Sequence, residues 1–181
     1  MSVKTPTMFK VLFRLVVSFF LLFQYGELLA TDSVYLFKEA HIQLEVNSHW
    51  HLQPRQEQNG FIIYVFKRDP VFDSLNRKII PNAAVVIEKI DPKMDVVAYS
   101  VNKRASGAFS VTQVFNHEDG IIRYVNAIGY KGTYTDQMDH IVYVVHAINE
   151  GEGMQIILDT TSETFPALEA EFLQILKSIR T

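Results

Sequence analysis

Near the end of the chain, the spacing of apolar residues changes from a strand pattern to a helical one. This change limits the possible fold classes more than any other feature of the sequence. Residues 121–134, 140–148 and 154–159 carry three strand patterns in succession, separated by the turns TDQMD and NEGEG, which predicts an antiparallel meander. The last segment then repeats its apolar residues about every 3.6 positions. One helical stripe holds Phe165, Leu168, Phe172, Ile175 and Ile179. Such a helix needs a sheet face to cover, so we expect an α+β fold with a C-terminal amphipathic helix.

Earlier segments supply further strands and a second helix. Strands are predicted over residues 42–46, 61–67, 83–90 and 109–115. The first of these alternates apolar and polar residues, whereas the second and third are apolar on both faces, as in the centre of a sheet. Asp95 is predicted to cap a helix over residues 96–103.

The first strand of the meander carries an aromatic row. Five of its side chains are predicted to share one face: Ile122, Tyr124, Ile128, Tyr130 and Tyr134. A row of this kind is usually part of the core or is covered by a helix. The alternative is a platform that binds a small ligand.

Residues 1–30 have the pattern of a secretory signal peptide. Three bases precede an apolar run over residues 15–23, and the segment ends on the small residue Ala30. The run is shorter than the roughly 20 residues that a transmembrane helix needs. We therefore expect cleavage after Ala30, which leaves a single domain over residues 31–181 without a stable membrane span.

Charge and cysteine content restrict the partners and the compartment. The full chain has 17 Lys and Arg against 20 Asp and Glu, and without the three bases and one acid of residues 1–30 the balance is 14 against 19, a net charge of −5. A nucleic-acid partner would need a basic face instead. The absence of cysteine excludes disulfides and lipid attachment to a cysteine. With no Asn-x-Ser/Thr acceptor present, we expect a periplasmic or secreted bacterial protein.

The order of these elements resembles the PsbP-like fold. The resemblance is carried by "HIQLEVNSHW", "GFIIYVFKRDP", "GYKGTYTDQMDHIVYVVHAIN" and "MQIILDTTSETFPALEAEFLQILKSI". This fold is shared by the extrinsic photosystem II subunit, a Ran-binding nuclear import factor and the bacterial envelope protein DcrB. The resemblance implies one α+β domain, an antiparallel sheet with helices on its faces, and binding or adaptor roles. It transfers no functional residue, because those proteins bind unrelated partners through different surfaces.

The clearest candidate for partner binding follows "GFIIYVFKRDP". Pro70 ends the strand because it has no N–H to donate to a ladder. The loop that follows mixes two kinds of side chain: Arg68, Asp73, Arg77 and Lys78 alternate with Val71, Phe72, Leu75, Ile79 and Ile80. We predict that the apolar residues anchor the loop and that the charged ones, above all the guanidinium groups, face a carboxylate or phosphate of a partner.

No reaction is indicated by the motifs. The chain has no cysteine nucleophile, no Gly-x-Ser-x-Gly sequence and no Gly-rich phosphate loop. His49 and His51 lie on one side of an extended segment and are the alternative metal ligands, although zinc or copper needs at least one more. We expect no metal and no cofactor.

The sequence thus predicts an exported, non-catalytic accessory or adaptor protein that binds a protein partner in the cell envelope or outside the cell. A first alternative is a module that binds a small ligand or metal. A second alternative is a hydrolase whose site is assembled in space, with carboxylates such as Asp69, Asp73, Asp136 or Asp139.

Overall fold

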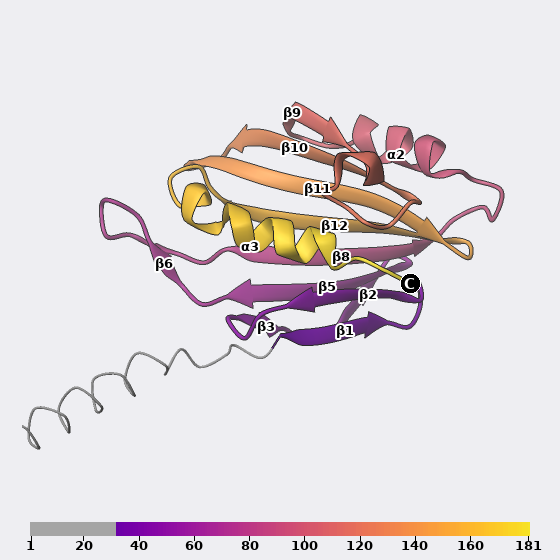
Figure 1. The fold of residues 1–181 in the computed structure, drawn as a ribbon, viewed down its shortest axis with the longest axis horizontal. Coiled ribbons are helices and arrows are strands. Elements are labelled where there is room, and N and C mark those ends of the chain that lie inside the picture. The colour runs from indigo at the N-terminus through magenta and orange to yellow at the C-terminus, as the bar shows by residue number, and fades with distance from the viewer. Residues whose placement is uncertain (1–31) are drawn as a thin grey trace, which may run out of the picture. The chain divides into compact units, whose positions relative to one another are not determined.

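Eight antiparallel strands form the main sheet of the protein (Figure 1). The computed structural model describes residues 32–181, so the predicted signal peptide lies outside the described residues. The strand order is β3-β5-β8-β12-β11-β10-β9, and β4 also pairs with β5. The strands of this sheet are β3 (Trp50–Leu52), β4 (Gln56–Gln58), β5 (Phe61–Arg68), β8 (Asn82–Lys89), β9 (Ser110–Phe115), β10 (Ala127–Thr135), β11 (Asp139–Asn149) and β12 (Glu152–Thr161). The predicted meander is confirmed as β10-β11-β12.

Two small ribbons and two α-helices complete the described part of the chain. One ribbon pairs β1 (Ser33–Phe37) with β2 (Ile42–Val46), and the other pairs β6 (Val71–Phe72) with β7 (Lys78–Ile79). The helices are α2 (Val96–Ala105) and α3 (Phe165–Lys177), and a 3-10 turn, η1, covers His117–Asp119. This arrangement confirms the predicted α+β fold with an antiparallel sheet.

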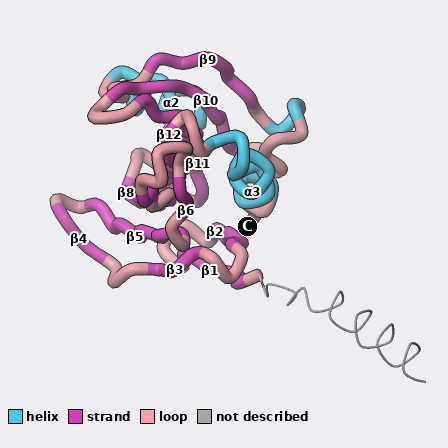
Figure 2. Tube along the Cα trace, turned by 90° about the vertical axis from the view of Figure 1, so that its left-hand side faces the viewer, coloured by secondary structure: helices cyan, strands magenta, loops and turns pink. Residues whose placement is uncertain are grey.

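The two helices cover opposite faces of the sheet (Figure 2). Neighbouring residues of a strand point to opposite faces. In β10, Tyr130 contacts Ser100 of α2, whereas Lys131 contacts Glu169 of α3. The β1-β2 ribbon lies on the same face as α3, because Ser178 at the end of α3 accepts a hydrogen bond from the backbone of β2.

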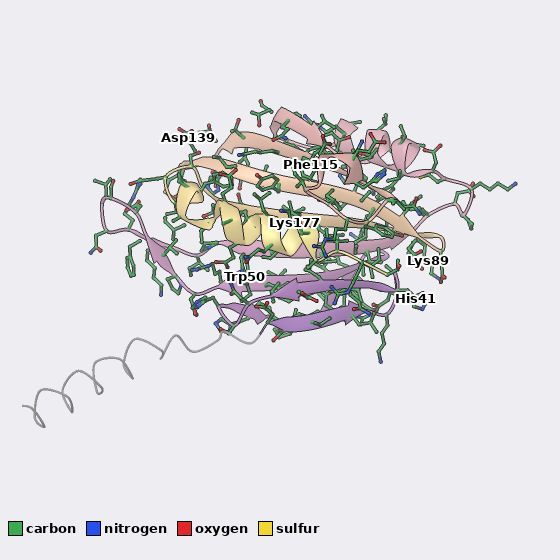
Figure 3. All side chains as sticks on the ribbon, in the orientation of Figure 1. His41, Trp50, Lys89, Phe115, Asp139 and Lys177 are labelled. Atoms are coloured by element: carbon green, nitrogen blue, oxygen red, sulfur yellow. The ribbon has the colours of Figure 1, made fainter. Side chains whose placement is uncertain are left out.

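The core lies between the sheet, α3 and the β1-β2 ribbon. All five residues of the predicted helical stripe are buried: Phe165, Leu168, Phe172, Ile175 and Ile179. Trp50 lies beside α3 (Figure 3), and its ring centroid is 6.1 Å from that of Phe172. Burial of each large apolar side chain contributes roughly 1.5–3 kcal/mol. The terminal helix is therefore held by its apolar stripe, as predicted.

Helix α2 begins where the sequence indicates. The Asp95 side chain accepts a hydrogen bond of 2.7 Å from the backbone N–H of Ala98, which satisfies one of the free donors of the first turn. Tyr99 and Ser100 are the buried residues of this helix, whereas Val97 and Val101 face solvent.

The predicted strand over residues 121–134 is too long at its N-terminal end. Residues 121–126 form no strand, and β10 begins only at Ala127. The reason lies in the preceding turn, where Asn116 and Asp119 form a capping box and Gly120 takes a left-handed conformation with φ 70°. Residues 121–126 therefore form an irregular segment that connects this turn to β10.

The aromatic row is divided by the same irregularity. Ile122 and Tyr124 pack in the core, and the Tyr124 hydroxyl donates to the carbonyl of Ile148. Tyr130 lies under α2 on the other face of the sheet, and Tyr134 stacks on a histidine of β11. The expectation of one shared face is therefore wrong, because the strand period does not extend through residues 121–126.

Candidate functional site

A short hairpin follows β5 and extends beyond the end of the main sheet (Figure 1). It contains the loop that the sequence singled out, with β6 and β7 as its two arms. The tip is held by Asp73, whose carboxylate accepts hydrogen bonds from the backbone N–H of Leu75 at 3.0 Å and of Arg77 at 2.7 Å. Asn76 takes the left-handed conformation, φ 58°, that a tight turn requires here. The tip is thus fixed by its own side chains.

Asp73 serves the hairpin internally. Its side chain is only 1 % exposed and also accepts a hydrogen bond from the Arg77 guanidinium at 2.5 Å. Burial raises the pKa of Asp73, but hydrogen bonds from the Arg77 backbone and side chain outweigh it, and the net pKa lies below the ordinary value. The ionised carboxylate therefore stabilises the turn and is not free for a partner.

The hairpin tip is also attached to the body of the protein. Glu163, just before α3, accepts a hydrogen bond of 2.6 Å from the backbone N–H of Ser74. The same carboxylate lies 3.8 Å from Nη2 of Arg77. On the inner side, Ile79 is buried and Val71 packs against the core. These contacts place the hairpin at a defined position relative to α3.

The outer side of the hairpin is apolar. Phe72 is 62 % exposed, Leu75 71 % and Ile80 46 %. Lys78 pairs with Phe72 across the ribbon and is exposed as well. The prediction that all apolar residues of the loop anchor it is correct for Val71 and Ile79 and wrong for these three, because a two-residue ribbon has only one side that can face the core.

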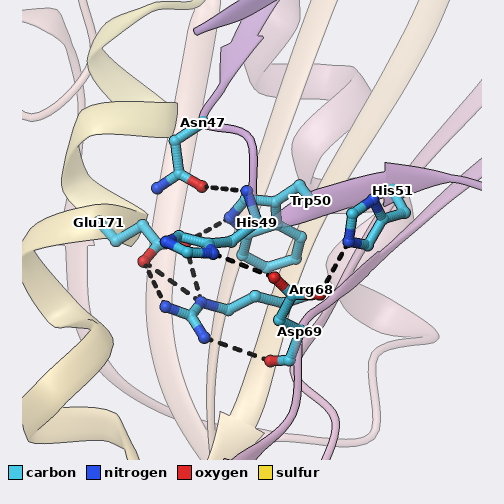
Figure 4. Close-up of polar contacts among 7 residues, drawn as sticks. All are labelled: Asn47, His49, Trp50, His51, Arg68, Asp69 and Glu171. Carbon is cyan, nitrogen blue, oxygen red and sulfur yellow. Dashed lines mark hydrogen bonds and ion pairs between the residues drawn. The ribbon is translucent and has the colours of Figure 1, made fainter. Parts of the chain in front are cut away.

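The base of the hairpin is held by a polar cluster (Figure 4). Asp69 is hydrogen-bonded to both predicted histidines, with Oδ2 3.0 Å from His49 Nδ1 and Oδ1 2.8 Å from His51 Nε2. These hydrogen bonds, first from His51 and then from His49, hold the pKa of Asp69 below its ordinary value. The Asp69 backbone N–H also donates to the carbonyl of His49. The pair of imidazoles therefore fixes the point at which the chain leaves β5.

Arg68 belongs to this internal support. Its guanidinium meets Glu171 of α3 in a bidentate pair, with distances of 3.0 Å from Nε to Oε1 and 3.1 Å from Nη2 to Oε2. The two side chains are only 14 % and 15 % exposed, and the Trp50 indole donates to the same carboxylate. The expected outward guanidinium at Arg68 is therefore wrong: this side chain joins β5 to α3.

The four predicted partner-binding residues thus divide into two groups. Arg68 and Asp73 point inward and support the hairpin. Arg77, whose side chain is half exposed, and Lys78 lie on its accessible part. The sequence analysis did not assign Phe72, Leu75 and Ile80 to partner binding. Their position between charged residues of the same loop was a signal that could have suggested this role.

The structure brings the two histidines of the alternative metal site to one carboxylate. His49 and His51 both meet Asp69, yet no group of three or more histidine and acidic side chains in residues 32–181 is arranged to hold a metal ion. The tyrosine platform is likewise not assembled, because Tyr124 and Tyr130 lie on different faces of the sheet and use their hydroxyls internally.

A buried serine and histidine meet under α2. The Oγ of Ser100 lies 2.9 Å from Nδ1 of His146 and 2.7 Å from the Tyr130 hydroxyl. Ser100 and Lys103 also have the Ser-x-x-Lys spacing of some acyl-transfer enzymes, a signal that the predictions above missed. However, Ser100 is 1 % and His146 2 % exposed, and Lys103 is paired with Glu88. The pair is therefore a core contact.

No helix within residues 32–181 is long and apolar enough to cross a membrane. No family model matches the sequence, and a search of curated proteins finds no similar sequence.

Two solved structures with TM-scores of at least 0.50 show the same fold. A protein of unknown function from Pseudomonas aeruginosa is 15 % identical, with a TM-score of 0.53 over 83 % of this chain and 96 % of the other. The cyanobacterial PsbP (CyanoP) from Synechocystis is 13 % identical, with a TM-score of 0.50 over 86 % of this chain and 95 % of the other. LpqN of Mycobacterium tuberculosis, described as involved in cell envelope biogenesis, has a TM-score of 0.48 at 14 % identity over 83 % and 91 %. The chain has the PsbP-like fold.

Proposed function

We propose that the protein is an exported, non-catalytic accessory protein that binds a protein partner of the cell envelope or the extracellular space through the β6-β7 hairpin. One observation carries this proposal: Phe72, Leu75 and Ile80 are exposed together on an ordered ribbon that extends beyond the sheet. Apolar groups gathered in this way on a soluble domain are typical of a surface that binds another protein.

The rigid support of the hairpin favours binding. Arg68 and Asp69 hold its base, and Asp73 and Glu163 hold its tip. A surface that already has its bound shape loses little conformational entropy when a partner docks. The polar residues that the sequence assigned to direct contact therefore contribute by fixing the position of the apolar ones.

Export and the absence of catalysis are the other parts of the proposal. Export is supported by the signal-peptide pattern of residues 1–30. A non-catalytic role is supported by the burial of the Ser100 and His146 pair, together with the internal use of Asp69 and Asp73. Asp69 and Asp73 are two of the four carboxylates that the sequence offered for acid-base chemistry.

Site-specific photo-crosslinking tests the proposal. A photoreactive phenylalanine analogue replaces Leu75 in the full chain, which is expressed in its own host and irradiated in intact cells. Val97 of α2 is the matched control position, because it is an apolar residue of similar exposure, 58 %. We expect one dominant protein adduct from position 75 and none of that mass from position 97. Equal adduct patterns at the two positions would contradict a docking role of the hairpin.

A further inference from the structure

Basic side chains outnumber acidic ones on the hairpin and at its base. Residues 67–78 contain four bases and two acids. Both acids already have partners in the protein, since Asp73 is 1 % exposed at its side chain and the half-exposed Asp69 is shared by two imidazoles. Arg68 is paired with Glu171, and Arg77 already has Asp73 and Glu163 beside it. Lys67, at the end of β5, and Lys78, on the hairpin itself, form no ion pair with any residue of the described range 32–181.

Lys78 also lies within the apolar surface. It is directly opposite Phe72 across the ribbon, and Ile80 follows two residues later, so the three side chains share one side of the hairpin. A partner that covers Phe72 and Ile80 must therefore cover Lys78 as well. Removing an ammonium group from water without a counter-charge is strongly unfavourable.

Resting on the proposed function, we infer that the partner surface is an apolar hollow bordered by a carboxylate, an Asp or Glu side chain that pairs with Lys78. A charge-assisted hydrogen bond of this kind compensates the desolvation of the ammonium group. It also selects the partner, because an uncharged or basic rim would leave Lys78 unpaired. The net negative charge of the whole chain, −3, makes this basic and apolar projection a local feature of an acidic protein.

An anionic lipid surface would also supply negative charge, but the arrangement of the hairpin favours a protein. A segment that lies on a bilayer carries its apolar side chains on one face and its cations on the opposite, polar face. Here the apolar side chains extend from Leu75 at the tip to Ile80 beside Pro81, whose carbonyl accepts from the Arg68 N–H at the base. The cation lies between them. The whole side of the ribbon is thus suited to a hollow in a protein.

A zero-length crosslink tests this inference. In envelope preparations of cells that express the full chain, a carbodiimide joins an ammonium group to a carboxylate as an amide, and the carbodiimide takes up the water that is lost. We expect mass spectrometry to find Lys78 joined to an Asp or Glu of the protein that the Leu75 photo-adduct identifies. Lys78→Arg keeps the charge but removes the reactive amine, so it should lose the amide and keep the photo-adduct.

Charge reversal gives the decisive comparison. Lys78→Glu should lower the photo-adduct yield at position 75 by about tenfold or more, because like charges then face each other. An unchanged yield would overturn the inference while leaving the proposed function intact. No protein adduct in the parent chain would contradict the proposed function itself. Flotation with vesicles of phosphatidylglycerol forms a separate arm: binding that Lys78→Glu abolishes, without any Lys78 amide to a protein, would overturn the protein partner in favour of lipid.

Discussion

His146 should make the stability of the protein depend on pH in a defined interval. Its imidazole is 2 % exposed under α2 and is bonded to Ser100. Burial, together with the positive charges of Lys103 and Arg104, lowers the pKa of His146 from 6.5 to about 4. The folded protein therefore holds this histidine neutral in a pH range where the unfolded chain protonates it.

The sign and size of the effect follow from proton linkage. Above pH 6.5 both states are neutral at His146 and the full stability is present; as the pH falls below 6.5 the unfolded state binds the extra proton and the folded state loses stability. The gap between 6.5 and about 4 corresponds to about 3 kcal/mol in total. Most of it, about 2 kcal/mol, should be lost between about pH 7 and 4.5.

Urea unfolding followed by circular dichroism at these two pH values measures the loss, and His146→Gln is the comparison because glutamine still forms hydrogen bonds but does not titrate. We expect the variant to lose about 2 kcal/mol less than the parent over the same interval. Asp69 and Glu169, whose pKa values are also lowered, titrate at lower pH and are common to both proteins. The same loss of stability in parent and variant would refute the reasoning.

Three further changes test the packing. Phe172→Ala, at a fully buried position of α3, should lower the free energy of unfolding by about 3–5 kcal/mol, and a melting temperature like that of the parent would disprove the core assignment. Glu171→Gln weakens the pair with Arg68 at the base of the hairpin and should cost about 2 kcal/mol in urea unfolding; an unchanged midpoint would mean that the pair is dispensable. Gly129→Ala would bring a Cβ within 2.1 Å of the Phe115 ring and should cost about 1–3 kcal/mol, whereas a neutral effect in thermal unfolding would contradict that close approach.

The elements of the fold follow from local patterns in the sequence. The stripe of α3 was predictable because a period near 3.6 and a length of several turns leave one interpretation. Its four residues in α3 are buried, and so is Ile179, which lies just beyond the end of the helix at Lys177. Asp95 was predictable as a cap because its hydrogen bond to Ala98 is local. The strand prediction over residues 121–126 failed because local composition was misleading there. Ile122 and Tyr124 are buried, as strand residues would be, but the segment that holds them is irregular.

The candidate site could be located in the sequence but not oriented. A charged and apolar loop after Pro70 was recognisable, and it is the hairpin that extends from the domain. The partner of Arg68 lies 103 residues away on α3, and such a distant pairing leaves no trace in local spacing. Which apolar residues face outward, Phe72 or Val71, depends on the side of the ribbon that meets the core. That choice is made by tertiary packing.

The most direct test of the account is a quantitative comparison of two surface variants in the host envelope. Phe72→Ser/Leu75→Ser alters the hairpin, and Val97→Ser/Val101→Ser alters α2 at residues of comparable exposure, 62 % and 71 % against 58 % and 61 %. Affinity purification of the tagged full chain after crosslinking, with labelled mass spectrometry, gives the ratio of partner to bait. The account predicts that one partner is lost from the hairpin variant and kept by the α2 variant. Equal recovery of that partner with both variants would contradict it.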